Sequence, residues 1–261
     1  MEKQEVLNQL EGLKSYKAPV FGADSIRIPN YSAIRTVEED KPLAILGEGY
    51  SLLNHYDAAK QVFDELDANV LNYNIRNLTT NDEKRMSMII GFPEMEFDVD
   101  GSKIEPTLTL CNSVDGTLRY SKIFGFLRLV CTNGLMVGEK LFSVRRKHTV
   151  NFEVQEFDYE KILAQNEKFK GLIEKSQTAR VTNEFKQSLV SSGFPERVIK
   201  NWNELFEKYN GMYRETVSGN TIWAIQAVLT NWLTNVVAKT NIDRANKLSV
   251  ALYNQMQSFV G

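Results

Sequence analysis

Hydrophobic and polar residues follow a helical period at the start of the chain. Leu7, Leu10 and Leu13 lie at helical spacing and predict a short amphipathic helix within the first twenty residues. Pro29 then divides "IRIPNYSAIR" into extended pieces, and "KPLAILGEGYSLL" is typical of a strand or a hairpin at its glycines. A second helix is predicted over residues 55–68, with an apolar face formed by Ala59, Val62, Phe63 and Leu66.

The period changes to two between Val70 and Thr149. Alternating strands are separated by three turn signals, which are Asp100-Gly101, Asp115-Gly116 and Asn133-Gly134. In the strand "LRYSKIFGFLRLVC", Gly125 marks a candidate bulge. Three hairpin turns in so short a stretch predict an antiparallel meander.

The pattern becomes helical again after Phe157. Four helices are predicted within residues 159–177, 192–211, 218–239 and 240–261. Pro195 lies just inside the start of the second and Gly211 just past its end, while Thr240 or Asn241 caps the fourth. The third is apolar almost all round and is expected to be the central buried helix.

These patterns predict an α+β fold, in which an N-terminal helix and an antiparallel meander sheet precede a four-helix C-terminal layer packed on the sheet. We divide the chain into an N-terminal arm (1–30), a sheet region (31–156) and a helical region (157–261), which together form one integrated domain. A chain of 261 residues is long enough for a large core.

Composition excludes several classes of protein. The contents of 43% hydrophobic and 25% charged residues are those of a folded globular protein. No apolar run is long enough for a transmembrane helix, and the charged N-terminus does not resemble a signal peptide, so no membrane contact is expected. Cys111 and Cys131 are the only cysteines, which argues against a structural disulfide and favours the cytoplasm.

Common catalytic and metal-binding motifs are missing from the sequence. There is no Walker A motif, no G-x-G-x-x-G and no H-E-x-x-H, and the two cysteines and two histidines lack zinc-ligand spacing. We therefore expect no metal and no cofactor. One catalytic hypothesis stays open, in which Cys131 is a nucleophile, His148 its base and Asn133 an orienting residue. A buried Cys131 at the end of a strand is the more ordinary interpretation.

Positive charge is concentrated in one part of a chain whose net charge is −2. Between Thr117 and Val150 there are seven lysines and arginines and one acid, Glu139. Such a cluster suits phosphate groups, and aromatic residues beside it suit base stacking. The same pattern also fits a charged sheet edge that resists edge-to-edge pairing. The candidate nucleic-acid-binding residues are Arg119, Tyr120, Lys122, Phe124, Arg128, Arg145, Arg146, Lys147 and His148.

Several segments occur in an order that identifies a family resemblance. They are "GYSLLNHYDAAKQVFDEL", "PTLTLCNSVDGT", "FLRLVCTNGL", "RRKHT" and "NTIWAIQAVLTNWL". Together they resemble the phage/plasmid-like family called domain of unknown function 932, over roughly Tyr31 to Asn235. The sequence departs from the family pattern at Val114, where a polar residue is usual, and at Asn231, where an acid is common.

The resemblance implies that a phage, plasmid or integrated element carries the protein, and that it works in the host cytoplasm. A hairpin-rich sheet followed by helices is similar in outline to the single-strand annealing proteins of phage recombination. Combined with the basic segment, this favours a non-catalytic nucleic-acid-binding protein, with single-stranded DNA as the favoured ligand and a homo-oligomer as a possible form. The alternatives are a factor that binds a host protein, such as an anti-defence inhibitor or a virion-assembly component, and a cysteine-dependent or metal-assisted enzyme.

Overall fold

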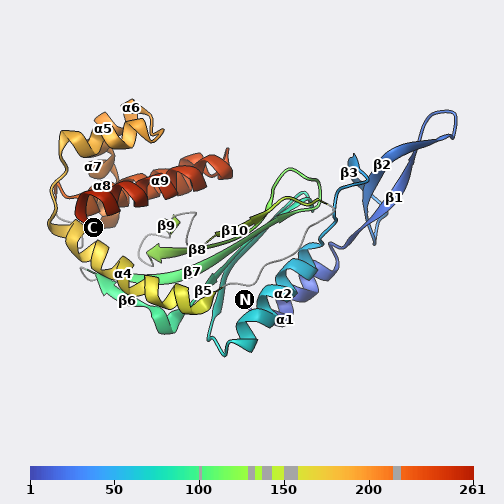
Figure 1. Cartoon of the computed structure of the whole chain (residues 1–261), viewed down its shortest axis with the longest axis horizontal. Helices are drawn as coiled ribbons and strands as arrows, with labels where there is room; N and C mark the ends of the chain where they lie inside the picture. The colour runs from blue at the N-terminus through green and yellow to red at the C-terminus, as the bar shows by residue number, and fades with distance from the viewer. Residues whose placement is uncertain (100–101, 129–132, 137–142, 150–157, 214–218) are drawn as a thin grey trace. The chain divides into compact units, whose positions relative to one another are not determined.

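A computed structural model describes residues 1–99, 102–128, 133–136, 143–149, 158–213 and 219–261 (Figure 1). It confirms the predicted α+β class, with an N-terminal helix, antiparallel sheets and helices of the C-terminal part packed against sheet strands. The chain divides into two compact units, and strands β7 and β8 each run through both of them. Unit 1 comprises residues 1–92, 108–123 and 143–157, and unit 2 comprises residues 93–107, 124–142 and 158–261.

Unit 1 begins with helix α1 (Lys3–Glu11), which packs against helix α2 (His55–Ala68). Of the predicted apolar positions, Leu7 and Leu10 on α1 and Val62 and Phe63 on α2 are buried, whereas Leu13 lies beyond the end of α1. The segment that connects α1 to α2 in the sequence forms an antiparallel sheet of three strands, which we call the N-terminal sheet. Its strands are β1 (Ser15–Phe21), β2 (Arg27–Thr36) and β3 (Pro42–Gly47).

A second antiparallel sheet has the strand order β10-β8-β7-β5-β4, with β6 paired to β7 and β9 paired to β8. Its strands are β4 (Asn74–Asn81), β5 (Arg85–Gly91), β6 (Phe97–Val99), β7 (Ser102–Ser113), β8 (Tyr120–Arg128), β9 (Asn133–Met136) and β10 (Ser143–Arg146). A short 3-10 helix, η1 (Pro93–Met95), separates β5 from β6.

The first predicted hairpin is present, since Val99 pairs with Ser102, although its turn residues 100–101 lie outside the described part of the chain. The second Asp-Gly signal lies in the loop of residues 114–119 between β7 and β8, where Gly116 adopts a φ of +73°, a conformation that glycine tolerates. The third prediction is wrong in position, because Asn133 and Gly134 belong to β9 and pair with Arg128 and Leu127.

Neither the β8–β10 ladder nor the β8–β9 ladder, as far as the structure describes them, contains the bulge expected at Gly125. Residues 120–123 of this strand pair with β10, and residues 125–128 pair with β9. Each of the two ladders keeps a constant register. Gly125 is the first residue of the ladder with β9, just after the ladder with β10 ends.

Unit 2 contains more helices than the four predicted. They are α4 (Tyr159–Thr178), α5 (Asn183–Ser191), α6 (Glu196–Lys200), α7 (Trp202–Tyr213), α8 (Ile222–Trp232), the π-helix η2 (Leu233–Val237) and α9 (Ile242–Val260). The helix predicted over 192–211 is broken at Asn201, and Gly211 lies inside α7 rather than past its end. No helix among the described residues has the length and apolar character needed to cross a bilayer.

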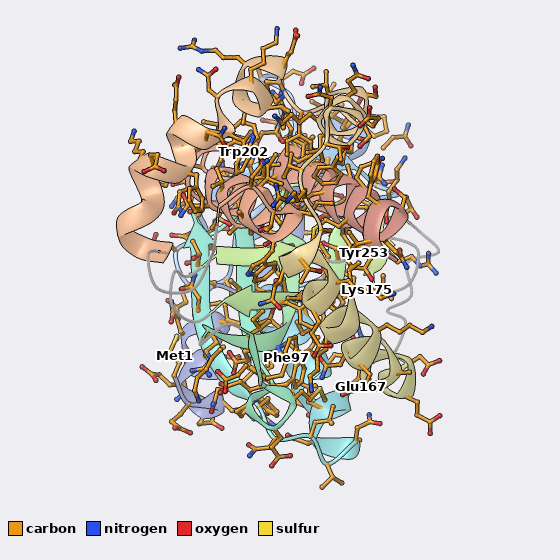
Figure 2. The ribbon with its side chains drawn as sticks, turned by 90° about the vertical axis from the view of Figure 1, so that its left-hand side faces the viewer. Met1, Phe97, Glu167, Lys175, Trp202 and Tyr253 are labelled. Atoms are coloured by element: carbon orange, nitrogen blue, oxygen red, sulfur yellow. The ribbon has the colours of Figure 1, made fainter. Side chains whose placement is uncertain are left out.

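Aromatic packing joins the strands and helices of unit 2. The rings of Phe126 on β8 and Phe169 on α4 stack with centroids 3.7 Å apart, and Phe97 meets both edge-on. Tyr253 of α9 completes this group, and Figure 2 shows Phe97 and Tyr253 with the exposed Glu167 and Lys175 of α4. Residues 222–231 of α8 are all buried, as its apolar sequence predicts.

Candidate nucleic-acid interface

Strand β10 forms one edge of the larger sheet and brings positive charge to that edge. Arg146 pairs with Tyr120 and Arg145 pairs with Ser121. Arg119 comes directly before this ladder on one strand, and Lys147 comes directly after it on the other. Four cations therefore gather at one end of the β8–β10 ladder, and we call Arg119, Arg145, Arg146 and Lys147 the basic edge.

The basic edge is accessible to solvent. Arg119, Arg146 and Lys147 are exposed and Arg145 is half-buried. Alternation along β10 turns Arg145 to the face of Ser121 and Arg146 to the face of Tyr120, so the cations project from both sides of the edge. Within the described part of the chain, Arg119, Arg146 and Lys147 form no ion pair. Their charges are therefore available to an external anion.

Three other predicted ligands lie in the interior. Tyr120, Lys122 and Phe124 are fully buried, so the predicted platform of alternating aromatic and basic side chains is wrong. The ammonium of Lys122 donates to both carboxylate oxygens of Glu65 on α2, at 2.6 Å each. This face of β8 is occupied by protein, and it cannot stack on bases.

The prediction that His148 contributes to the interface is also wrong, because its side chain is buried. It is only 6% exposed, and its Nδ1 lies 3.2 Å from the carbonyl oxygen of Ser51. Burial lowers the pKa of His148 below the ordinary value of 6.5, and the bond to Ser51 opposes this only in part. His148 is therefore neutral at neutral pH and does not add a charge to the basic edge.

The segment after Lys147 is held in place by its neighbours in unit 1. Backbone and ring contacts join His148 to Ser51, and the His148 ring stacks on Tyr50 with centroids 5.2 Å apart. The hydroxyl of Tyr50 in turn donates to the carbonyl oxygen of Ser113, at 2.8 Å. Burial raises the pKa of Tyr50 to about 12, so this hydroxyl stays protonated and keeps donating.

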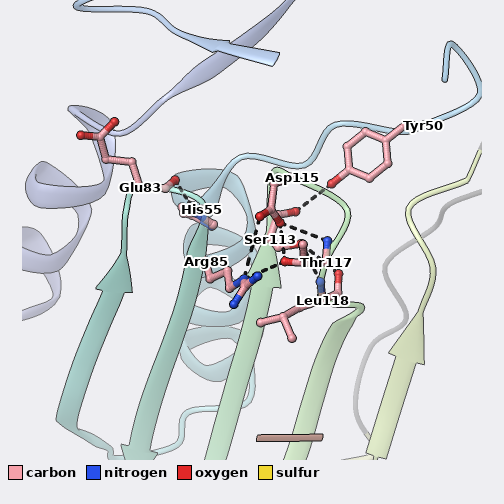
Figure 3. Close-up of polar contacts among 8 residues, drawn as sticks. All are labelled: Tyr50, His55, Glu83, Arg85, Ser113, Asp115, Thr117 and Leu118. Carbon is pink, nitrogen blue, oxygen red and sulfur yellow. Dashed lines mark hydrogen bonds and ion pairs between the residues drawn. The ribbon is translucent and has the colours of Figure 1, made fainter. Parts of the chain in front are cut away.

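The loop that precedes Arg119 is fixed by its own polar side chains (Figure 3). Asp115 accepts from the backbone N–H of Thr117 at 3.0 Å, and the Arg85 guanidinium donates to the Thr117 hydroxyl at 2.7 Å. The Ser113 hydroxyl donates to the Leu118 carbonyl and accepts from the Leu118 N–H, each at 3.0 Å. Such a loop presents Arg119 from a defined backbone rather than from a mobile one.

Below this loop, His55 connects helix α2 to strand β7. The Asn112 amide donates to the Leu53 carbonyl at 2.9 Å and lies 3.1 Å from His55 Nδ1. His55 Nε2 lies 3.2 Å from the Glu83 carbonyl, as Figure 3 shows. Burial lowers the pKa of His55 to about 4. The ring is therefore neutral, with Nε2 donating and Nδ1 accepting.

Of the residues that support the basic edge, Tyr50, His55, Asn112 and Asp115 were not predicted individually, whereas His148 was predicted as a ligand rather than as a support. All five come from three of the segments that carried the family resemblance. Their occurrence together in those segments was the available signal, and the structure shows that they meet in space. Val114, the departure from the family pattern, is fully buried in an apolar cluster with Ile34 and Leu43.

The described residues do not include Cys131, the nucleophile of the catalytic hypothesis, or the side chains of Arg128 and Asn133. The Nδ1 of His148, its candidate base, lies 3.2 Å from the carbonyl oxygen of Ser51. Cys111 is buried, and no group of three or more His, Cys, Asp or Glu in the described chain could hold a metal ion.

Comparison with known proteins adds a family to this geometry. The family described as Domain of unknown function (DUF932) matches residues 42–254, which include both the basic edge and the polar residues that support it. No curated protein and no solved structure matches the chain.

Proposed function

The chain belongs to the DUF932 family, and we propose that it is a non-catalytic protein that binds nucleic acid through the basic edge. One observation carries the proposal. Arg119, Arg145, Arg146 and Lys147 gather at one sheet edge, in a chain whose net charge is −2. Because like charges repel, a polyanion at this edge would stabilise Arg119, Arg146 and Lys147, which form no ion pair within the described part of the chain.

The chemistry of the basic edge suits phosphate groups. Three of its members are arginines, and a guanidinium can donate two parallel hydrogen bonds to one phosphate. With the aromatic platform buried, the edge offers contacts to the backbone of a nucleic acid and no stacking surface. Binding through it is therefore expected to depend on salt and only weakly on base sequence.

Single-stranded DNA is the ligand that we favour. A flexible strand can adapt the spacing of its phosphates to cations along one short edge, whereas the phosphate rows of a duplex are fixed. We further propose that the protein serves a phage or plasmid in the host cytoplasm, as the family resemblance implies. A role in annealing would place it in strand exchange during recombination of such an element.

The test is fluorescence anisotropy of the purified protein with labelled single- and double-stranded oligonucleotides, across a salt series. If all four cations neutralise phosphates of a single strand, log K should fall against log salt with a slope of about −3. Tighter binding to the single strand would support the favoured ligand, and equal binding would reduce the proposal to phosphate recognition in general.

Charge reversal at the basic edge gives the matched comparison. Arg146→Glu with Lys147→Glu should abolish binding, because two attractive charges become repulsive on side chains that are exposed and contribute little to folding. The control is Lys168→Glu with Lys239→Glu, which makes the same charge change on exposed side chains of unit 2. Wild-type affinity in the first variant would refute the assignment of the edge, and equal loss in both would show only a nonspecific charge effect.

Complete absence of binding at low salt would refute the nucleic-acid proposal. A host protein would then be the partner to seek, by capture from lysate that has been treated with nuclease.

A further inference from the structure

Exposed apolar side chains are concentrated on the N-terminal sheet. Among the described residues, eleven large hydrophobic side chains are exposed, and seven of these lie between positions 16 and 45. The seven are Tyr16, Phe21, Ile26, Ile28, Tyr31, Val37 and Ile45. Single exposed hydrophobic residues are common on protein surfaces, but a group of them on one small sheet indicates an interaction surface.

The two faces of the N-terminal sheet differ in what covers them. On the inner face, Ile34 is fully buried and packs in a cluster with Leu43 and Val114. On the outer face, Ile45 pairs with Ala33 and is 63% exposed, and Tyr31 pairs with Gly47 and is 49% exposed. The inner face belongs to the core of unit 1, and the outer face is open.

Charges on this sheet are largely neutralised within it. Arg27 pairs with Glu48 at 3.1 Å, and Arg35 pairs with Asp40, which also accepts from the Tyr16 hydroxyl. The surface around the exposed apolar residues is therefore nearly neutral. It does not attract a polyanion, which separates it from the basic edge.

The two edges of the sheet are not equally protected against pairing. Strand β1 carries Lys17 and Pro19, and both residue types discourage a further strand from joining an edge. Strand β3 reads "PLAILG", with no charge and with proline only at its first position. In the described part of the chain, no strand joins the outer side of β3.

The backbone of β3 is oriented for such pairing. The N–H of Glu48 donates to the carbonyl of Asn30 on β2, so it points into the sheet. Because these directions alternate along an antiparallel strand, the N–H and carbonyl of Ile45 point to the free edge. Ile45, which is 63% exposed, thus also presents backbone groups that no described strand pairs with.

We propose that β3 pairs antiparallel with β3 of a second copy of this chain, about a two-fold axis at Ile45. Antiparallel pairing of one edge with itself satisfies two-fold symmetry, and it joins two three-stranded sheets into one of six strands. The two Ile45 side chains become direct neighbours on the outer face. In this register, position 41 lies opposite position 49 of the second copy and position 48 lies opposite position 42, so each Lys41 comes within one residue of Glu48 of the second copy.

Charge complementarity of this kind favours a second copy over an unrelated partner. Within one copy, Lys41 forms an ion pair with Glu83 at 3.2 Å, and Glu48 forms one with Arg27. These side chains are about a third to more than half exposed, so ion pairs between copies can replace the existing ones at little cost. Pairing would also cover the apolar residues nearest the edge. The inference does not depend on nucleic-acid binding.

The first experiment is sedimentation analysis of the wild-type protein over a range of concentrations. We expect a monomer–dimer equilibrium that Ile45→Lys abolishes, because two like charges would face each other at the axis. The control is Val236→Lys, which places a lysine at an exposed apolar position of unit 2 and should leave the dimer intact. A wild-type protein that is monomeric at all concentrations would overturn the proposal.

Charge reversal tests the register. Lys41→Glu should weaken the dimer by placing two acids together at each end, and adding Glu48→Lys should restore it. A merely structural role for either residue would not predict this rescue. If the double variant dimerises no better than Lys41→Glu, the antiparallel register is wrong.

Crosslinking provides a test that does not require disruption of the fold. Hydrogen-bonded antiparallel neighbours have Cα atoms about 5.5 Å apart, which is within disulfide range. Ile45→Cys should therefore form a covalent dimer on mild oxidation, whereas Val37→Cys, exposed on the same unit but distant from the axis, should not. Equal crosslinking by both variants, or by the wild-type cysteines, would contradict pairing at Ile45.

Discussion

At the scale of single residues, burial determines which titratable groups carry charge. The two histidines of the chain are both buried, and the pKa of each is lowered mainly by desolvation. The basic edge consists of three arginines and one lysine, whereas the two histidines are neutral hydrogen-bonding groups at neutral pH. Acid should therefore act on folding through these buried histidines.

The first prediction concerns the acid stability contributed by His55. The unfolded state, with a pKa near 6.5, takes up a proton before the folded state, with a pKa of about 4. This contribution is complete above pH 6.5 and is lost as the pH falls toward 4, by about 3 kcal/mol in total. Protonation would also place an N–H on Nδ1 against the Asn112 amide donor.

Urea unfolding between pH 7 and pH 4 measures this effect. In His55→Gln the drop in the free energy of unfolding over that range should be smaller than in the wild type, whatever the stability of the variant at pH 7. His148→Gln serves as the comparison for the other buried histidine. An unchanged pH profile in His55→Gln would show that other groups cause the acid sensitivity.

At the scale of elements, a buried ion pair connects helix α2 to strand β8. The side chain of Lys122 is fully buried and that of Glu65 is 9% exposed. Charges removed from water in this way are costly unless both partners are present. The pair therefore holds α2 against β8 within unit 1. Its lysine is one of the residues that the sequence analysis predicted to bind nucleic acid.

The second prediction follows from that pair. Lys122→Met should lower the free energy of unfolding by about 3–5 kcal/mol, because the buried Glu65 carboxylate loses its ion pair with Lys122. Adding Glu65→Leu should recover most of the loss, since neither charge is then buried. Chemical denaturation of the two variants measures this.

The matched control is the exposed pair Lys60–Asp64 on the same helix, whose side chains are 50% and 54% exposed. There Lys60→Met should change the free energy of unfolding little, because exposed ion pairs are screened by solvent. If the double variant at Lys122 and Glu65 is as unstable as Lys122→Met, the loss arises from packing and not from the uncompensated carboxylate.

At the scale of the whole molecule, the two units share strands. β7 and β8 run through both, so their backbone hydrogen bonds contribute to the order of each unit. Trp202, Trp223 and Trp232 all belong to unit 2. Tryptophan fluorescence therefore reports on that unit alone, while far-ultraviolet circular dichroism reports on both.

The third prediction is that the two units unfold together. Lys122→Met perturbs unit 1, yet it should lower the fluorescence midpoint as much as the circular dichroism midpoint, because loss of β7 and β8 in one unit removes their support in the other. A fluorescence midpoint that keeps its wild-type value, beside a lowered circular dichroism midpoint, would show independent unfolding.

The sequence by itself determined the identity of most elements and the clustering of positive charge. Helix spacing located α1, α2 and α8, and Asp-Gly signals located two hairpins, because these patterns depend on residues close in the chain. The exposed members of the basic edge, Arg119, Arg146 and Lys147, also came from local composition. Asn133-Gly134 failed as a turn because strand pairing with β8 placed these residues in a ladder instead.

Only the tertiary structure decided which residues face solvent. Tyr120, Lys122 and Phe124 alternate as an exposed platform would, but Glu65, 57 residues from Lys122 in the chain, occupies that face from α2. The meeting of Tyr50, Ser113 and His148 likewise joins distant segments. Alternation specifies that a strand has two faces, whereas the element that packs on each face depends on long-range contacts that no local pattern contains.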